Sequence, residues 1–218
     1  MKDLKAKHAE ALLRKLVGEG EHVNQDFKFT VNDPRKIART ISAFANNSGG
    51  HLLIGVDDNG QLRGVRNEED IYVVEAAATV YCEPACLPEF TAYKAKGGAV
   101  IIRAEIAKAS SRPVYVKEEK NRRKAYYRVA DENIIAHPLI VRAWKAIDDP
   151  DNSILYNMSS ARVSILTALE KGPVTFEKLA IEVGLSKKNL EEVIVQLTAM
   201  GVVDFIYVER QFMIYLKQ

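Results

Sequence analysis

The chain has 218 residues, with 31 lysines and arginines against 29 aspartates and glutamates, and a formal net charge of +2. With 47% hydrophobic and 28% charged residues, its composition excludes a collagen, a coiled coil and a disordered chain. No apolar run reaches the roughly 20 residues of a membrane span, and the N-terminus lacks the apolar core of a signal peptide. We therefore expect a cytoplasmic protein with no membrane partner, whose cysteines, Cys82 and Cys86, are free thiols.

The first third of the chain alternates between helix and strand patterns. Apolar residues at three- and four-residue spacing predict a helix over 4–17, and period-two alternation predicts a strand over 27–31. Asp33 then caps a helix that starts at Pro34 and ends at 46–50. A strand over 51–56 follows, and the pair Asn59–Gly60 predicts a hairpin with a return strand over 62–65.

Further along, the patterns predict a helix over 68–80, two strand pairs (90–94 with 99–106, and 114–117 with 125–129) and a helix over 137–147. Hairpins outnumber strand–helix–strand crossovers, so the sequence predicts an α+β fold rather than a doubly wound sheet. The turn-forming residues 148–153 mark the best boundary. The predicted organisation is a first domain over 1–147, a linker over 148–158 and a second domain over 159–218.

The second domain has a different pattern. Helices are predicted over 159–170, 176–183 and 187–200, with a tight turn at 184–186, followed by strands over 202–208 and 211–216. Three helices, a short turn between the second and third, and a terminal hairpin together predict a winged helix-turn-helix.

Several blocks of the first domain occur together in a fixed order. They are Glu21, residues 26–28 (DFK), 41–46 (ISAFAN), 48–60 (SGGHLLIGVDDNG), 112–115 (RPVY) and 127–133 (YRVADEN). This series resembles the AlbA-like domain shared with Schlafen proteins, over about residues 8–137. Bacterial members pair this domain with a C-terminal winged helix, so the resemblance implies a DNA-binding transcriptional regulator.

The resemblance also implies an alternative function. The Schlafen branch includes RNA-cleaving enzymes in which three acids act together, and these fall on Glu21, Asp26 and Asp58. Such a set would be both the metal site and the catalytic site of a metal-dependent endoribonuclease, because carboxylate oxygens bind Mg²⁺ or Mn²⁺. The second acid is Asp where the family usually has Glu. Without this activity we expect no cofactor, with Asp58 as a turn residue and Glu21 solvated.

Basic residues provide the candidate phosphate contacts. Residues 103–128 hold nine basic side chains against three acidic ones. From this stretch and from the strand over 27–31 we expect contacts at Lys28, Arg122, Arg123, Lys124 and Arg128.

In the second domain, the recognition helix begins with Lys187, Lys188 and Asn189, which could reach phosphates or bases. Glu191 and Glu192 follow directly and would repel DNA. We therefore predict a protein that binds nucleic acid, in particular DNA, as a homodimer or higher homo-oligomer. A further alternative is a sensor whose winged helix mediates oligomerisation or other protein contacts.

Overall fold

The computed structural model describes residues 4–66, 69–149 and 159–217. The chain divides into two compact units, Met1–Ala136 and His137–Gln218, and each is described by itself. No helix in these described ranges has both the length and the apolar character needed to cross a bilayer.

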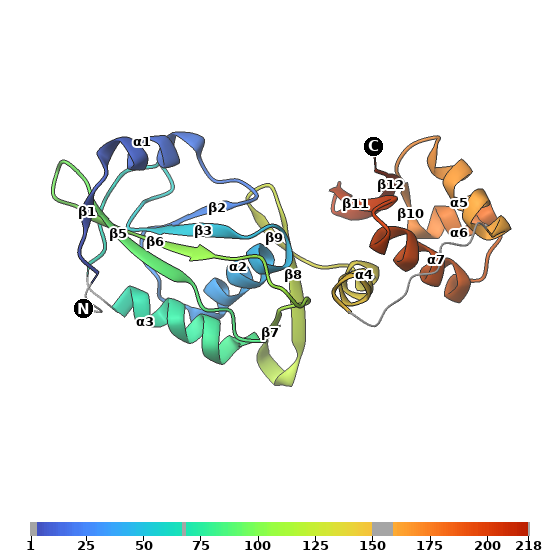
Figure 1. Ribbon diagram of the computed structural model, residues 1–218, viewed down its shortest axis with the longest axis horizontal. Helices are drawn as coiled ribbons and strands as arrows, with labels where there is room; N and C mark the ends of the chain where they lie inside the picture. Colours follow the sequence, from blue (N-terminus) through green and yellow to red (C-terminus); the bar gives the residue numbers. More distant parts are fainter. Residues whose placement is uncertain (1–3, 67–68, 150–158, 218) are drawn as a thin grey trace. The chain divides into compact units, whose positions relative to one another are not determined.

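Within its described residues, the first unit contains three α-helices and nine strands (Figure 1). Its helices are α1 (Glu10–Glu19), α2 (Pro34–Asn46) and α3 (Glu69–Ala76), and a π-helical turn (Ala77–Tyr81) continues α3. Its strands are β1 (Lys7–His8), β2 (Gln25–Lys28), β3 (Gly50–Ile54), β4 (Cys82–Glu83), β5 (Glu89–Lys94), β6 (Val100–Ile106), β7 (Tyr115–Lys117), β8 (Arg123–Val129) and β9 (Glu132–Ile135).

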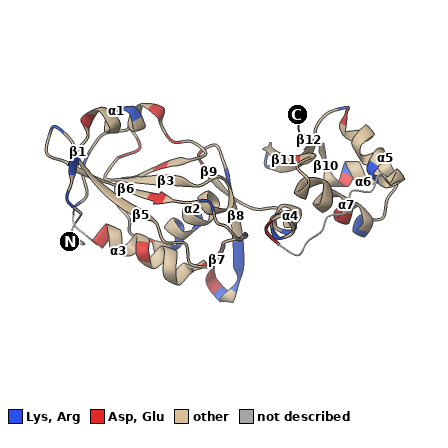
Figure 2. Ribbon diagram, in the orientation of Figure 1, with Lys and Arg blue, Asp and Glu red and all other residues tan. Residues whose placement is uncertain are grey.

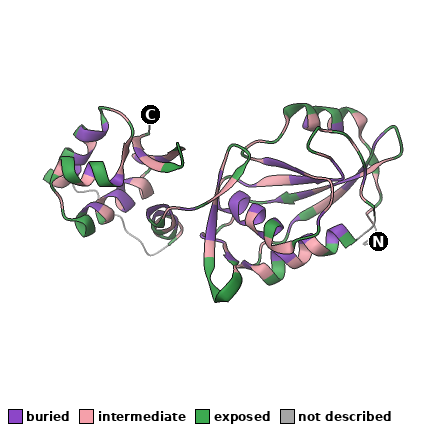
Figure 3. Cartoon of the chain, turned by 180° about the vertical axis from the view of Figure 1, so that it is seen from behind, coloured by how far each residue is buried: buried purple, intermediate pink, exposed green. Residues whose placement is uncertain are grey.

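These strands form two sheets around α2. The five-stranded sheet has the order β1-β5-β6-β3-β2, with β1 parallel to β5 and β2 parallel to β3. The four-stranded sheet, β4-β7-β8-β9, is antiparallel. Helix α2 contacts strands of both sheets and buries nine of its 13 residues, so it is the central element of the core (Figure 3). The predicted α+β class is confirmed.

Local chemistry explains both ends of α2. Asp33 caps its start by accepting hydrogen bonds from the amides of Arg35 and Lys36, as predicted. After the helix, Gly49 has a φ of 80°, and a Cβ at this position would lie 2.8 Å from the carbonyl oxygen of Ile106. Only glycine therefore lets the chain pass tightly from α2 into β3.

The second unit contains α4 (Pro138–Asp148), α5 (Ser160–Leu169), α6 (Phe176–Val183) and α7 (Lys187–Ala199). An antiparallel sheet of order β10-β12-β11 completes it, formed by Val174–Thr175, Gln211–Leu216 and Val203–Val208. We expected the helix at 137–147 to close the first domain, but α4 packs on α7 and belongs to the second unit. Most of the expected linker, residues 150–158, lies outside the described residues.

The structure differs from the expected elements at one hairpin. The segment after Asn59–Gly60 forms no strand: it makes an isolated bridge between Val56 and Leu62, and the Val65 amide donates to the Val100 carbonyl at 2.8 Å. Instead, the Asp57 carboxylate accepts hydrogen bonds from the amides of Asn59 and Gln61 and closes the turn. Cys82 and Cys86 are free, as expected.

Candidate nucleic-acid interface

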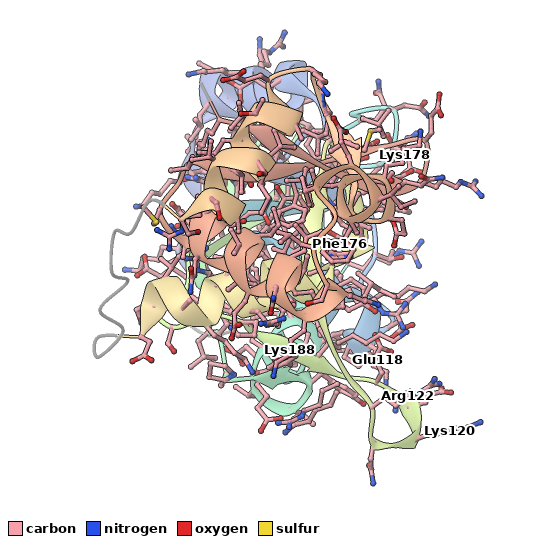
Figure 4. All side chains as sticks on the ribbon, turned by 90° about the vertical axis from the view of Figure 1, so that its right-hand side faces the viewer. Glu118, Lys120, Arg122, Phe176, Lys178 and Lys188 are labelled. Atoms are coloured by element: carbon pink, nitrogen blue, oxygen red, sulfur yellow. The ribbon has the colours of Figure 1, made fainter. Side chains whose placement is uncertain are left out.

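The β7–β8 hairpin carries the densest group of basic residues in the first unit (Figure 2). A short 3-10 turn, Glu119–Asn121, joins its strands, and within it Lys120 and Asn121 have φ of 56° and 55°, in the left-handed region. Figure 4 shows Lys120 and Arg122 projecting from the hairpin end, away from the body of the unit. Lys117 and Arg123 are exposed as well, whereas Lys124 is half-buried.

The acids of the hairpin are paired with arginines of α2. Arg39 holds both carboxylate oxygens of Glu118 at 2.8 Å, and the hydroxyl of Tyr126 donates to the same carboxylate at 2.5 Å. The bond from Arg39 is the main cause that lowers the pKa of Glu118 from 4.5 to about 2, so this acid stays ionised and bound to its partners. Arg35 similarly contacts Glu119 at 3.2 Å.

Helix α2 and the hairpin thus form one basic area, which we call the basic hairpin surface. It consists of Arg35, Lys36, Arg39, Lys117, Lys120, Arg122, Arg123 and Lys124. Three of these pair with acids: Arg39 with Glu118, Arg35 with Glu119, and Arg123 with Glu83 at 3.3 Å. The other five make no ion pair with any described residue, so the surface keeps a clear excess of positive charge.

Two buried polar side chains of α2 hold the base of the hairpin. Asn46 donates to the carbonyl oxygens of Val114 and Tyr126 and accepts from the amide of Val114 at 2.7 Å. Ser42 donates to the Val114 carbonyl at 2.7 Å and accepts from the Tyr126 amide at 3.1 Å. Both side chains are fully buried. Because these bonds fix the backbone of β7 and β8 against α2, the basic hairpin projects from a rigid base.

Arg128 lies in the core, although sequence reasoning placed it among the phosphate contacts. Its side chain is 1% exposed and lies 3.2 Å from Asp26, with its guanidinium 5.1 Å from the centre of the Phe44 ring. It also donates to the Asn133 side chain at 2.9 Å and to the Gln25 carbonyl at 3.3 Å. In this structure Arg128 is therefore a buried partner of Asp26 and does not face solvent.

Two of the three candidate catalytic acids, Glu21 and Asp26, lie together. Lys28 lies 2.8 Å from Asp26 Oδ2 and 4.0 Å from Glu21 Oε1. Glu21 also accepts a hydrogen bond from the amide of Phe27 at 2.7 Å. Burial and the neighbouring Asp26 raise the pKa of Glu21. Lys28 is thus engaged by carboxylates, and a phosphate would have to compete with them for it.

Asp58 does not join this pair in an arrangement suited to a metal. In the described part of the chain, no three His, Cys, Asp or Glu side chains are placed to hold one ion. One Asp26 oxygen already faces Arg128 and the other faces Lys28. The residues as arranged therefore do not fit a shared Mg²⁺ or Mn²⁺, and Asp58 is an exposed turn residue.

The second unit places its candidate contacts at the exposed start of α7. Ser186 caps this helix by accepting from the amide of Asn189, and Lys187, Lys188 and Asn189 are all exposed. Glu191 forms an ion pair with Arg142 of α4 at 3.0 Å. This pairing reduces the negative charge that follows Lys188, while Glu192 remains exposed.

Sequence reasoning missed the contribution of α2 to the basic surface. The polar side of the helix carries Arg35, Lys36 and Arg39. Lys36 and Arg39 follow Arg35 by one and four positions, and this spacing was visible in the sequence. The pairing of Arg39 with Glu118 was not visible, because it joins residues 79 positions apart.

Comparison with known proteins places the first unit in a family. The Schlafen AlbA_2 family model matches residues 21–137, and no curated protein matches. Among solved structures, the chain is similar to DIP2311 of Corynebacterium diphtheriae (16% identity, TM-score 0.48), covering 93% of this chain but only 38% of DIP2311. It is also similar to the N-terminal domain of a RecG-related protein of Nitrosomonas europaea (24% identity, TM-score 0.41), covering 61% of this chain and 96% of that domain. Because the family model spans more than half of the sequence, the chain belongs to the Schlafen AlbA_2 family.

Proposed function

We propose that this protein binds nucleic acid through the phosphate backbone, using the basic hairpin surface of its first unit. The observation that carries the proposal is the pairing of the local acids. Glu118 and Glu119, which would otherwise repel phosphates, are bound by Arg39 and Arg35. Lys117, Lys120 and Arg122 remain exposed on the hairpin.

This arrangement suits the phosphate backbone of a nucleic acid. Lysine and arginine side chains on an exposed hairpin neutralise backbone charge without reading sequence. The hairpin is also a two-stranded antiparallel ribbon with a short turn, and such a ribbon fits the major groove of a duplex. The small net charge of +2 is no obstacle, because the excess is local.

The test compares two variants of the full chain that lose three positive charges each. Lys117→Ala/Lys120→Ala/Arg122→Ala removes exposed charge from the hairpin, and Lys15→Ala/Lys94→Ala/Lys96→Ala removes it from α1, β5 and the β5–β6 loop. With a labelled 20-base-pair duplex at 50 mM salt, fluorescence anisotropy should show affinity falling at least about tenfold for the hairpin variant. The control variant should change affinity far less. Equal losses in the two variants, or no binding by the wild type, would reject the proposal.

We further propose that the second unit is a winged helix-turn-helix and that the whole protein is a DNA-binding transcriptional regulator acting as a homodimer. Support comes from the order α5, α6, α7 and the β11–β12 hairpin, with Lys187, Lys188 and Asn189 exposed at the start of α7. On a duplex that contains a selected operator, Asn189→Ala should relax sequence preference, whereas Lys188→Ala should weaken binding to all sequences. A monomer in light scattering, both free and with DNA, would refute the dimer.

A further inference from the structure

We propose that a cavity beside the basic hairpin surface binds one unpaired nucleobase of the strand whose phosphates that surface holds. This inference rests on the proposed function and adds single-stranded or locally unpaired segments to the nucleic acid that the protein binds. The cavity has a volume of about 510 Å³, within the usual range of ligand sites. It lies between the segment after β2 and the start of α3, and is lined by Phe29, Thr30, Val31, Asn32, Arg66, Glu69, Asp70 and Val73.

The lining of the cavity includes an arginine next to an aromatic ring. The Arg66 guanidinium lies over the Phe29 ring, 5.3 Å from its centre. Arg66 is exposed and Phe29 is half-buried. Aromatic rings and guanidinium planes are the two kinds of side-chain surface on which unpaired bases stack.

The same cavity carries acceptors for the edge of a base. Asp70 is 7% exposed and is fixed by its bond to the Val31 amide at 3.1 Å, and Glu69 is exposed beside it. Carboxylate oxygens accept hydrogen bonds from amino groups such as those of adenine and cytosine. Two carboxylates would repel a phosphate, so the cavity suits the base of a nucleotide while the basic surface suits its phosphate.

The cavity and the basic hairpin surface are adjacent along the chain. Asn32 lines the cavity, Asp33 caps α2, and Arg35 in the first turn of α2 belongs to the basic surface. Arg35 in turn contacts Glu119 of the hairpin at 3.2 Å. A strand whose phosphates contact the start of α2 would therefore bring a neighbouring base to the cavity.

The test measures binding of the full chain to two labelled 12-nucleotide probes, an adenine strand and a strand of abasic nucleotides. Phe29→Leu removes the ring but keeps an apolar side chain, and it should weaken binding to the adenine strand about 5- to 100-fold. Binding to the abasic strand should not change. Phe29→Tyr should restore affinity for adenine, which separates stacking from loss of folding. The matched control is Tyr72→Leu, an exposed aromatic residue of α3 outside the cavity.

A second variant, Glu69→Ala, distinguishes recognition of the base by Glu69 from repulsion of phosphates by Glu69. If Glu69 accepts a bond from the base, the variant binds the adenine strand more weakly. If Glu69 only repels phosphates, the variant binds both strands more tightly, and the inference is overturned. The inference is also overturned if Phe29→Leu weakens binding to the two probes equally. It is likewise overturned if free AMP competes as strongly as the adenine strand. Failure of the proposed function gives a different result, because Lys117→Ala/Lys120→Ala/Arg122→Ala would then leave binding to the abasic strand unchanged.

Discussion

Replacing Arg128 by methionine tests the buried position of this side chain. The substitution keeps most of the volume beside Phe44 but removes the positive charge next to Asp26. Breaking a buried ion pair by removing one partner costs about 3 to 5 kcal/mol, since the other charge is left buried. Asp26 keeps Lys28 at 2.8 Å, and Lys28 is one third exposed, so we expect a loss near the lower limit, about 3 kcal/mol.

The assay must report on the first unit. The only tryptophan, Trp144, lies in α4 of the second unit, so its fluorescence does not follow this region. Urea unfolding followed by far-UV circular dichroism, with hydrogen exchange of β2, gives the free energy of unfolding of the first unit. In a double-mutant cycle, Asp26→Asn with Arg128→Met should cost less than the sum of the single changes. A loss below about 1 kcal/mol for Arg128→Met, or strictly additive losses, would refute the buried pair.

The other predictions concern the frame of the hairpin and its acids. Asn46→Ala leaves the Val114 amide without its hydrogen bond and weakens the base of the hairpin. The free energy of unfolding should therefore fall by about 2 to 4 kcal/mol. A loss under about 1 kcal/mol would contradict this role of Asn46. Gly49→Ala places a Cβ 2.8 Å from the Ile106 carbonyl oxygen at a positive φ. In the same urea assay, the free energy of unfolding should fall by more than about 1 kcal/mol. An unchanged urea midpoint would contradict this prediction. Glu118 stabilises the fold fully above its ordinary pKa of 4.5, and this stabilisation disappears as the pH falls towards the folded-state pKa of about 2. Glu118→Gln should therefore make the free energy of unfolding less dependent on pH between these two values. An acid unfolding titration that is unchanged in the variant would refute the pairing with Arg39.

Local signals in the sequence predicted much of the fold. Asp33 and Pro34 marked the start of α2 correctly, because capping depends on neighbouring residues only. The helices and hairpin of the second unit also lie within a few residues of their predicted positions. The prediction of a return strand after Asn59–Gly60 was wrong, because the Asp57 side chain closes that turn by accepting hydrogen bonds from the backbone.

The candidate site was less predictable because it depends on distant partners. Arg128 looks like any basic strand residue until β8 places it beside Asp26, which is 102 positions away. Glu118 and Glu119 lie within the basic stretch of the sequence, and only the packing of α2 against β7 and β8 shows that Arg39 and Arg35 pair with them. In contrast, the capping residue Ser186 marked the start of α7 in the sequence, and Lys187, Lys188 and Asn189 lie exposed in the first turn of that helix.

The salt dependence of binding tests the central claim most directly. For duplex DNA, the logarithm of affinity falls with the logarithm of salt concentration by about 0.9 for each phosphate that the protein neutralises. If Lys117, Lys120 and Arg122 each contact one phosphate, the slope for Lys117→Ala/Lys120→Ala/Arg122→Ala should be shallower than for the wild type by about 2.7. The Lys15→Ala/Lys94→Ala/Lys96→Ala control should keep the wild-type slope. Identical slopes for the wild type and the hairpin variant would show that the phosphates lie elsewhere and would contradict the account.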